Sequence, residues 1–301
     1  MSSLEFGPLV LGGNTFGWTS DRGESFSVLD GFVEAGGVSI DTADVYSAWV
    51  PGNSGGESET IIGEWLASRQ HRERVLIATK VFSLPTRKGL SRANILAAVD
   101  DSLRRLQTDY LDLYYAHRDD QEVPQEEYVA AFDELVTAGK VREVGASNFS
   151  AERLRSAVTI AKDAGLAPFT VSQDHYNLIE RGLEQSLVPT LGELGIVELP
   201  YAALASGFLT GKYRPGVAVD SARAGGAGKH LDSPRNLELL GVLDDIAESR
   251  GVEPASVALA WLRDRPTVAA PIASARTVEQ LPALMESFGL ALTDEELARL
   301  P

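Results

Sequence analysis

Eight short apolar runs alternate with amphipathic segments along nearly the whole chain. The runs are rich in Val, Ile, Leu and Ala with little polar alternation, which is typical of parallel strands covered on both faces. We expect strands near residues 8–13, 38–42, 75–81, 111–117, 141–147, 170–175, 196–202 and 268–273. The amphipathic segments predict helices near residues 25–36, 57–69, 92–107, 126–139, 150–164, 183–194, 236–264 and 277–287. Eight repeats in 301 residues favour one α/β domain, residues 1–301, folded as a closed (β/α)8 TIM barrel with its active site at the C-terminal rim of the strands.

An open, doubly wound sheet is the main alternative to a barrel for an alternating chain of this kind. A dinucleotide-binding open sheet usually shows G-x-G-x-x-G after its first strand. Here that position reads Gly12-Gly13-Asn14-Thr15-Phe16-Gly17, which does not match. No linker rich in Pro or Ser divides the chain. One segment, residues 214–236, is long, Gly-rich and without periodicity. Because it follows the seventh expected strand, we predict a flexible cofactor or substrate loop there.

Charge and cysteine content exclude several classes of function. The chain has 27 Lys and Arg against 43 Asp and Glu, a net charge of −16, which disfavours nucleic acid and anionic lipid as partners. It has no cysteine, which excludes disulfides and thiolate metal sites and suits an intracellular enzyme. No apolar run approaches the roughly 20 residues that cross a bilayer, and no signal peptide is visible. We therefore expect a cytoplasmic protein without a membrane partner.

Four polar residues stand at or just beyond the ends of consecutive expected strands. Asp41, Lys80 and His117 each close an apolar run, and Tyr46 follows the first of these runs after a short loop. In a parallel barrel these ends meet at one rim, where the active site forms. Each residue alone has a structural explanation: a turn cap, a packed aromatic, a solvated strand end or a hydrogen-bonded histidine. The four together predict a functional site.

These residue types suit proton transfer to a carbonyl oxygen. The pKa of tyrosine is near ~10, and we expect the Lys80 ammonium to lower the pKa of Tyr46 while Asp41 keeps that lysine charged and in place. His117 can orient a carbonyl or share the proton. Tyr46 would then act as a general acid while hydride reaches the carbonyl carbon. No metal site is predicted, because lysine only donates and no histidine or cysteine cluster is present.

These segments, with others further along the chain, resemble the signature segments of the aldo-keto reductases. They are Asp41–Tyr46, Ala78–Lys80, Asp112–Arg118, Gly145–Phe149, Gln173–Asn177 and Ala205–Tyr213. The match runs from about Leu9 to beyond Arg276. The resemblance implies a (β/α)8 barrel that reduces aldehydes or ketones with NADPH, with NADH as the second candidate. It also implies that Tyr46 is the proton donor, that Lys80 and Asp41 tune it, and that His117 orients the substrate carbonyl.

The resemblance further implies a cofactor site. Its residues would be Gly13, Ser147, Asn148, Gln173, Tyr201, Ala202, Leu204, Ser206, Gly207, Thr210, Lys212, Ser274, Arg276 and Gln280. Ser147, Asn148 and Gln173 would hold the nicotinamide carboxamide, and Tyr201 would stack under its ring. Ser274, Arg276 and Gln280 match the pocket for the adenosine 2′-phosphate, where the planar fork of an arginine suits phosphate oxygens. The segment Ala283-Leu284 replaces a Glu-Asn pair of many relatives, which leaves the preference for NADPH over NADH open.

The resemblance implies a small carbonyl compound as the substrate and partner, and the sequence specifies neither the identity of this compound nor the oligomeric state of the protein. Phe16, Trp18 and Trp49, with His117, are the predicted substrate-binding residues; the three aromatics could form a wall for apolar or sugar-like carbonyls, or ordinary packing. The alternative function is an NADPH-binding regulatory or redox-sensing subunit, since some relatives modulate a membrane channel. A barrel lyase or isomerase would leave Ser147-Asn148 unexplained. Relatives often have a longer N-terminal hairpin across the barrel bottom, which we expect here to be short or absent.

Overall fold

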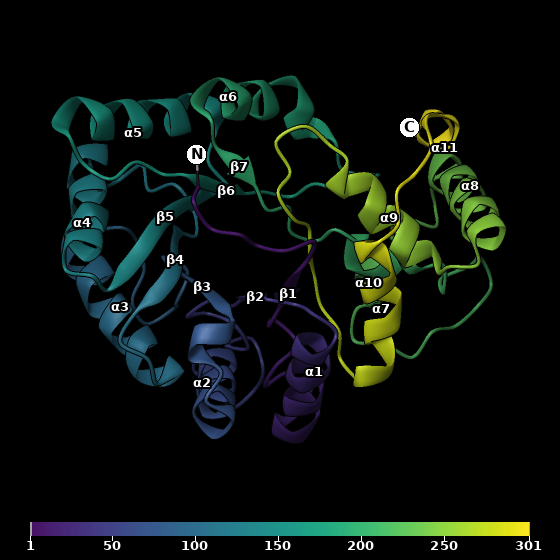
Figure 1. Cartoon of the computed structure of the whole chain (residues 1–301), viewed down its shortest axis with the longest axis horizontal. Helices are drawn as coiled ribbons and strands as arrows, with labels where there is room; N and C mark the ends of the chain where they lie inside the picture. Colours follow the sequence, from purple (N-terminus) through teal and green to yellow (C-terminus); the bar gives the residue numbers. More distant parts are fainter. Residues whose placement is uncertain (1, 301) are drawn as a thin grey trace.

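The computed structural model of the chain describes residues 2–300 and contains one sheet of eight parallel strands (Figure 1). The strands are β1 (Val10–Gly12), β2 (Ser39–Asp41), β3 (Leu76–Val81), β4 (Leu111–Ala116), β5 (Val141–Ser147), β6 (Val171–Gln173), β7 (Val197–Glu198) and β8 (Ile272–Ala273). Each strand from β1 to β6 pairs in parallel with the next, and β1 also pairs with β8. All eight predicted strands are therefore present.

Backbone hydrogen bonds between the β7 and β8 regions close the sheet into a barrel. The amide of Glu198 donates to the carbonyl of Thr267 over 2.8 Å, and the amide of Ala269 donates back to the carbonyl of Glu198 over 2.9 Å. Higher on the rim, the amide of Ile272 donates to the carbonyl of Pro200 over 2.8 Å. A closed barrel has no free sheet edge, and the predicted (β/α)8 fold is confirmed.

Helices surround the barrel on its outside (Figure 1). They are α1 (Arg22–Glu34), α2 (Glu57–Arg69), α3 (Arg92–Leu106), α4 (Gln125–Thr137), α5 (Ala151–Ala164), α6 (Leu187–Leu194), α7 (Ala224–Gly228), α8 (Pro234–Arg250), α9 (Pro254–Arg263), α10 (Leu281–Met285) and α11 (Asp294–Arg299). Short 3₁₀ helices add turns, including η1 (Arg72–Arg74) and η3 (Ala205–Thr210). Within residues 2–300, no helix combines the length and apolar character that crossing a membrane requires.

The single helix expected over residues 236–264 is instead two helices, α8 and α9. The chain breaks at Gly251, which has the left-handed φ of 65° that glycine adopts at the end of a helix. Three residues later, Pro254 occupies the first turn of α9, where its missing N–H costs nothing. Both halves of the segment are amphipathic in sequence, so the hydrophobic periodicity did not indicate that the helix ends at Arg250 and a second one begins at Pro254.

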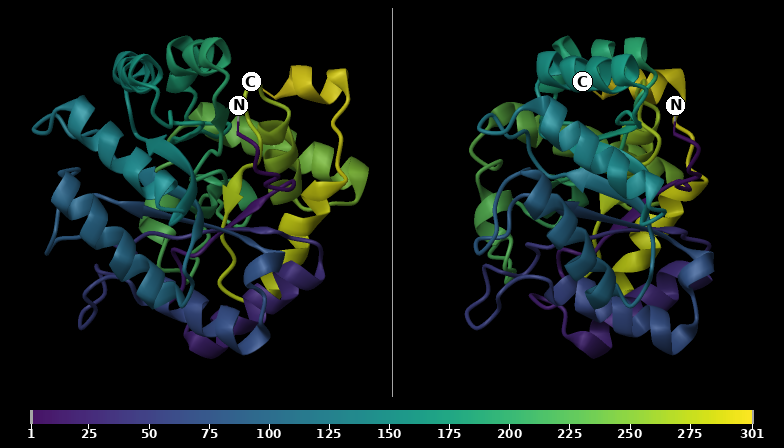
Figure 2. Two further views of the ribbon diagram at one scale, coloured as in Figure 1. Left: turned by 60° about the vertical axis from the view of Figure 1, so that its left-hand side comes forward. Right: turned by 90° about the vertical axis from the view of Figure 1, so that its left-hand side faces the viewer.

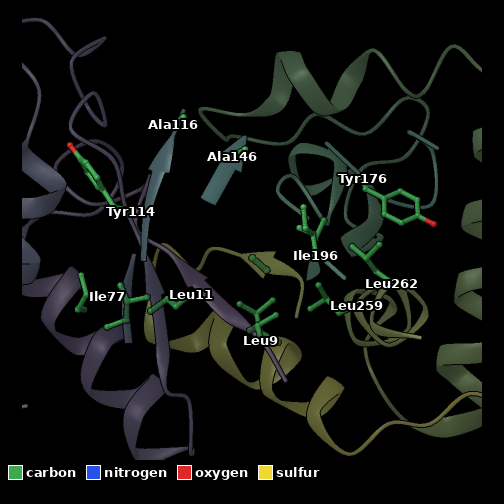
Figure 3. Close-up of a cluster of buried hydrophobic side chains, with 14 of the residues drawn as sticks. Leu9, Leu11, Ile77, Tyr114, Ala116, Ala146, Tyr176, Ile196, Leu259 and Leu262 are labelled. Atoms are coloured by element: carbon green, nitrogen blue, oxygen red, sulfur yellow. The ribbon is translucent and has the colours of Figure 1, made fainter. Parts of the chain in front are cut away.

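Two hydrophobic clusters fill the two sides of the sheet. The larger one lies between strands and helices and includes Leu9, Leu11, Ile77, Tyr114 and Leu259 (Figure 3). The smaller one includes the alternate strand residues Val10, Ala78, Leu113, Tyr115, Val171 and Ile272. Because successive strand residues point to opposite faces, this second cluster fills the barrel interior and forms the floor beneath the rim.

The N-terminal segment adds to this interior cluster. Phe6 is buried in it and Leu4 packs against it. The hydroxyl of Ser3 donates to Oε1 of Glu143, near the start of β5, over 2.6 Å. This segment therefore covers the bottom of the barrel. Figure 2 (right) shows it on the opposite side of the barrel from the green segment that follows β7.

Candidate active site

Strand periodicity brings three of the four candidate residues to one rim of the barrel interior. Lys80 lies two residues after Ala78, and His117 lies two residues after Tyr115; Ala78 and Tyr115 both belong to the interior cluster. Asp41 ends β2, one residue after Ile40, which points to the outer cluster. Since side chains alternate along a strand, all three point inward at the C-terminal ends of β2, β3 and β4.

The ammonium group of Lys80 is the hub of this group. Its Nζ donates to Oδ2 of Asp41 over 2.6 Å, to the carbonyl of Thr42 over 2.7 Å and to the hydroxyl of Tyr46 over 3.0 Å. A lysine has three hydrogens to donate and accepts none, so all three are in use. The hydroxyl hydrogen of Tyr46 is therefore not directed at Lys80, and its other neighbour, Oδ2 of Asp41, lies at a long 3.4 Å.

Burial has the largest single effect on the pKa values of Tyr46 and Lys80. It raises the pKa of Tyr46 to about 12, against the opposing attraction of the Lys80 ammonium. Lys80 acts to lower this pKa, as expected from the sequence, but removal of water from around the phenol outweighs the nearby positive charge. Burial also acts to lower the pKa of Lys80, but the Asp41 carboxylate overcomes it and the pKa is raised. At neutral pH the group therefore holds a neutral tyrosine, an ammonium and a carboxylate.

His117 is neutral in this environment. Burial, together with the charges of Lys80 and Arg118, holds the pKa of His117 well below its usual value. Its Nδ1 is buried and finds no hydrogen-bond partner among residues 2–300. We therefore assign the ring hydrogen to Nε2. The His117 and Tyr46 rings meet edge to face with centroids 6.3 Å apart.

A cavity of about 480 Å³ opens above these residues and takes in most of the predicted cofactor set. Predicted residues that line it are Asp41, Tyr46, His117, Trp18, Ser147, Asn148, Gln173, Tyr201, Ala202, Leu204, Ser206, Gly207, Thr210, Lys212, Ser274, Arg276 and Gln280. Lys80 lies directly below, bonded to Tyr46. Gly12 lines the wall in place of Gly13; the amide of Gly13 instead donates to the Asp41 carbonyl over 2.7 Å.

The three candidate substrate aromatics occupy different environments. Phe16 is fully buried in the outer hydrophobic cluster and does not reach the cavity. Trp18 lines the cavity. The Trp49 ring packs edge to face against the Trp18 ring, with centroids 5.6 Å apart. Trp49 is 50% exposed and also meets the Tyr46 ring at 6.2 Å. Trp18 and Trp49 thus form an aromatic edge beside the Tyr46 ring.

Side chains from β5, β6 and the residues after β7 form a connected polar wall. Nε2 of Gln173 donates to Oδ1 of Asp41 over 2.8 Å, Nδ2 of Asn148 donates to the Ser147 hydroxyl over 2.8 Å, and the Tyr201 hydroxyl donates to Oδ1 of Asn148 over 2.8 Å. Asn148 has a left-handed φ of 57°, which asparagine tolerates better than most residues. The His175 ring stacks on the Tyr201 ring with centroids 5.4 Å apart.

A buried pair of acids that the sequence did not reveal supports this wall from behind. Oδ1 of Asp174 accepts the backbone N–H of Asn148 over 2.9 Å, and its Oδ2 accepts the Ser172 hydroxyl over 2.5 Å. The Asp174 amide donates to Oε1 of Glu198 over 2.8 Å. Burial raises the pKa of Asp174 to about 6, and burial with the Asp174 charge raises that of Glu198 well above its usual value. Raised pKa values of this kind mean that the state with both neighbouring carboxyl groups charged is disfavoured.

Cations gather on the cavity wall formed by β7, β8 and the segment between them. Lys212, Arg223 and Arg276 line this wall. The guanidinium of Arg223 donates to Oδ1 of Asn14 over 3.2 Å and lies over the Trp18 ring. Burial and the charge of Arg276 both lower the pKa of Arg223. Two guanidinium groups that repel each other at one wall suit an anionic group between them, which fits the phosphates of a dinucleotide.

The segment over residues 214–236 supplies part of this wall. Ser221 and Arg223 line the cavity, and the short helix α7 follows. A Cβ added at Gly226 would lie 3.2 Å from Oγ of Ser206, so α7 packs closely on the stretch predicted to bind pyrophosphate. The sequence predicts a loop here, but Arg223 was not among the predicted cofactor residues. The one sequence signal for Arg223 is its position just before a Gly-rich run. The flexibility of the segment remains a prediction.

Asp44, three residues after Asp41, is, within residues 2–300, an unpartnered buried acid close to the catalytic candidates in the chain. Asp44 is buried, and neither carboxyl oxygen finds a hydrogen-bond partner within the described chain. Burial, then the charge of Glu59, raises the pKa of Asp44 to about 7.

Across the part of the chain that the structure describes, no group of three or more His, Cys, Asp or Glu side chains could hold a metal ion.

Comparison with known proteins agrees with this geometry. A sequence model of the aldo/keto reductase family matches residues 8–301. The oxidoreductase YrpG of Bacillus subtilis (strain 168), described as uncharacterized, is 34% identical over 309 residues, 99% of this chain and 92% of its own length. Protein tas of Escherichia coli (strain K12) is 33% identical, with 99% and 94% covered. Norsolorinic acid reductase B of Aspergillus parasiticus is 33% identical, with 98% and 80% covered.

Proposed function

Because the chain belongs to the aldo/keto reductase family, we propose that it is an NADPH-dependent enzyme that reduces an aldehyde or ketone to an alcohol with Tyr46 as the proton donor. The family and the oxidoreductase names of its relatives make the protein an oxidoreductase. Its members generally use NAD(P)H. The carbonyl reduction, the choice of NADPH and the roles of the residues are our proposal.

One observation carries this proposal: the Tyr46 hydroxyl borders the cavity while it accepts a hydrogen bond from Lys80 over 3.0 Å. The hydroxyl keeps its own hydrogen, because burial raises the pKa of Tyr46 to about 12. When that hydrogen leaves, the phenolate oxygen already has an ammonium partner. Asp41 holds this ammonium in place from 2.6 Å. A proton donor whose product charge is balanced in advance lowers the barrier to transfer.

The proposed reaction needs one hydride and one proton. NADPH, when bound, supplies the hydride to the carbonyl carbon. Tyr46 gives its proton to the carbonyl oxygen, so that an alcohol forms and Tyr46 is left as a phenolate beside Lys80. Neutral His117 would donate from Nε2 to the same carbonyl oxygen and orient it. The charged imidazolium form of His117 is disfavoured there, because its pKa lies well below the usual value.

The cofactor assignment depends on two walls of the same cavity. The wall of Ser147, Asn148 and Gln173 offers amide and hydroxyl groups beside Tyr46, which suit a carboxamide. The wall of Lys212, Arg223 and Arg276 offers cations, which suit phosphates. We propose NADPH because the guanidinium of Arg276 makes no hydrogen bond or ion pair in residues 2–300 and is available for a 2′-phosphate. NADH remains the second candidate.

The substrate side is proposed to lie between the Trp18–Trp49 edge and His117. The aromatic edge would contact the apolar part of a small carbonyl compound. Norsolorinic acid reductase B carries a reductase name, which agrees with reduction as the direction of interest. The cytoplasmic location expected from sequence likewise remains a proposal.

Oxidation of NADPH, followed by its absorbance with a panel of aliphatic and aromatic aldehydes and ketones, tests the proposal. The wild type should turn over at least one class, and Tyr46→Phe should lower kcat by about 100-fold or more. Tyr110→Phe is the matched control, because Tyr110 lies outside the cavity before β4. Tight NADPH binding without oxidation by any carbonyl would instead favour the regulatory-subunit alternative. Wild-type rates in Tyr46→Phe would show that Tyr46 is not the donor.

A further inference from the structure

We propose that Arg118 forms an anion subsite beside the catalytic residues, and that the substrate is an aldehyde or ketone that also carries a carboxylate. This inference rests on the proposed function, because it identifies the substrate class of the same cavity. Arg118 directly follows His117 and lines the cavity. It is exposed, so a ligand entering the cavity can reach its guanidinium group.

The distribution of charge around the cavity separates Arg118 from the other cations. Four cations line it: Arg118, Lys212, Arg223 and Arg276. The last three lie on the wall of β7, β8 and the segment between them, where the phosphates of the cofactor are proposed to bind. Arg118 lies after β4, next to His117, the residue proposed to orient the substrate carbonyl. Its charge is therefore left over once the cofactor phosphates are assigned.

The carboxylates that follow Arg118 in the chain are already engaged by other groups. Oδ2 of Asp119 accepts from Nε of Arg153 over 2.7 Å, and its Oδ1 accepts from the same guanidinium over 2.9 Å. Oδ2 of Asp120 accepts the Leu90 amide over 2.8 Å. The guanidinium of Arg118 makes no hydrogen bond or ion pair within residues 2–300. In a chain of net charge −16, a cation left unpaired at a cavity mouth is an available anion partner.

The cavity offers no competing negative charge to such a ligand. Asp41 is the one carboxylate in its lining within the described chain, and its charge is balanced by Lys80 at 2.6 Å. A carboxylate on the substrate would therefore meet net positive charge. The planar fork of arginine suits a carboxylate in two-point contact. The aromatic edge of Trp18 and Trp49 would contact the carbon skeleton between the carbonyl and the carboxylate.

Matched aldehydes test this subsite. The probes are 3- and 4-formylbenzoate with their methyl esters, which keep the aldehyde and the ring but remove the charge. In the wild type, kcat/KM should be higher for a formylbenzoate than for its ester. Arg118→Gln should lower that ratio about 10-fold, mainly through the KM of the acid, and Arg118→Lys should lower it less. Raising the salt concentration should reduce the ratio in the wild type.

The control is Arg74→Gln, which removes another exposed arginine, in η1 ahead of β3 and outside the cavity. It should leave the ratio unchanged. Calorimetric titration of formylbenzoate in the absence of reduced cofactor gives a second readout, and Arg118→Gln should weaken this binding. A ratio and an affinity that do not change in Arg118→Gln overturn the subsite. No reduction of any aldehyde contradicts the proposed function instead, and the calorimetric affinities then decide the subsite alone.

Discussion

Nε2 of Gln173 on β6 donates a hydrogen bond over 2.8 Å to Oδ1 of Asp41 on β2, across the barrel interior. This bond joins the wall proposed to hold the nicotinamide to the residues proposed to move the proton. Asp41 uses its other oxygen, Oδ2, for Lys80. Both carboxylate oxygens are therefore held, and the orientation of Lys80 toward Tyr46 depends on Gln173 as well as on Asp41.

Gln173→Ala should weaken both stability and catalysis. The loss of a buried hydrogen bond to a charged group should lower the free energy of unfolding by about 2 kcal/mol, and the freed Asp41 should lower kcat by about 10-fold. Denaturant unfolding and NADPH oxidation measure the two effects. Gln125→Ala is the control, because the Gln125 amide is also buried and donates to the Arg153 carbonyl over 2.9 Å, and neither residue lines the cavity. An equal loss of kcat in both variants would contradict the coupling.

Lys80→Met should destabilise the fold and abolish the proposed proton transfer. Asp41 would be left as a buried carboxylate without its ion partner, which typically costs about 3–5 kcal/mol. Adding Asp41→Asn removes the unpaired charge, so the double variant should recover much of the stability but none of the activity. Thermal unfolding and kcat separate the two losses. Lys162→Met on α5, an exposed position, is the control. A double variant no more stable than Lys80→Met would show that the unpaired charge is not the cause.

Asp44 should make stability decrease as pH rises toward neutrality. Its pKa is raised from 3.8 to about 7, so the folded state binds a proton more tightly than the unfolded state. Its contribution is fully present below about pH 4 and is lost as pH rises through 7, with a size on the order of 4 kcal/mol. Asp44→Asn should remove this dependence. The difference in unfolding free energy between Asp44→Asn and the wild type should therefore grow in favour of the variant from pH 4 to pH 8. A constant difference would contradict the raised pKa.

The barrel and the polar rim were predictable from sequence because local patterns specify them, whereas the candidate cofactor residues came from the resemblance to the aldo-keto reductases. Eight apolar runs predicted the strands, and the polar residues that end β2, β3 and β4 predicted the rim. Asp41, Lys80 and His117 needed no long-range information, since the ends of parallel strands meet at one edge.

What sequence did not reveal depends on burial and on contacts between distant segments. The pKa of Tyr46 is raised because the surrounding chain removes water, and no local pattern reports that desolvation. Glu198 and Asp174 are 24 residues apart, and neither looks functional until the barrel places them behind Asn148. Phe16 and Trp18 lie two residues apart in one loop, yet only Trp18 reaches the cavity. Arg223 reaches Asn14 from 209 residues away.

Arg276 and Arg223 should affect cofactor binding in different ways. If Arg276 binds the 2′-phosphate, Arg276→Gln should weaken NADPH binding about 10-fold and leave NADH binding within about two-fold. Arg223 lies nearer Asn14 and Trp18, so Arg223→Gln should weaken both cofactors to a similar extent. Fluorescence titration of each variant with NADPH and NADH measures these affinities without turnover.

Ala283 lies on α10, where its carbonyl accepts the Ser256 hydroxyl over 2.7 Å, and Leu284 is buried in the core. Neither replaces the Glu-Asn pair of relatives as a polar contact, so discrimination between the two cofactors depends on Arg276, and equal losses for NADPH and NADH in Arg276→Gln would refute that role.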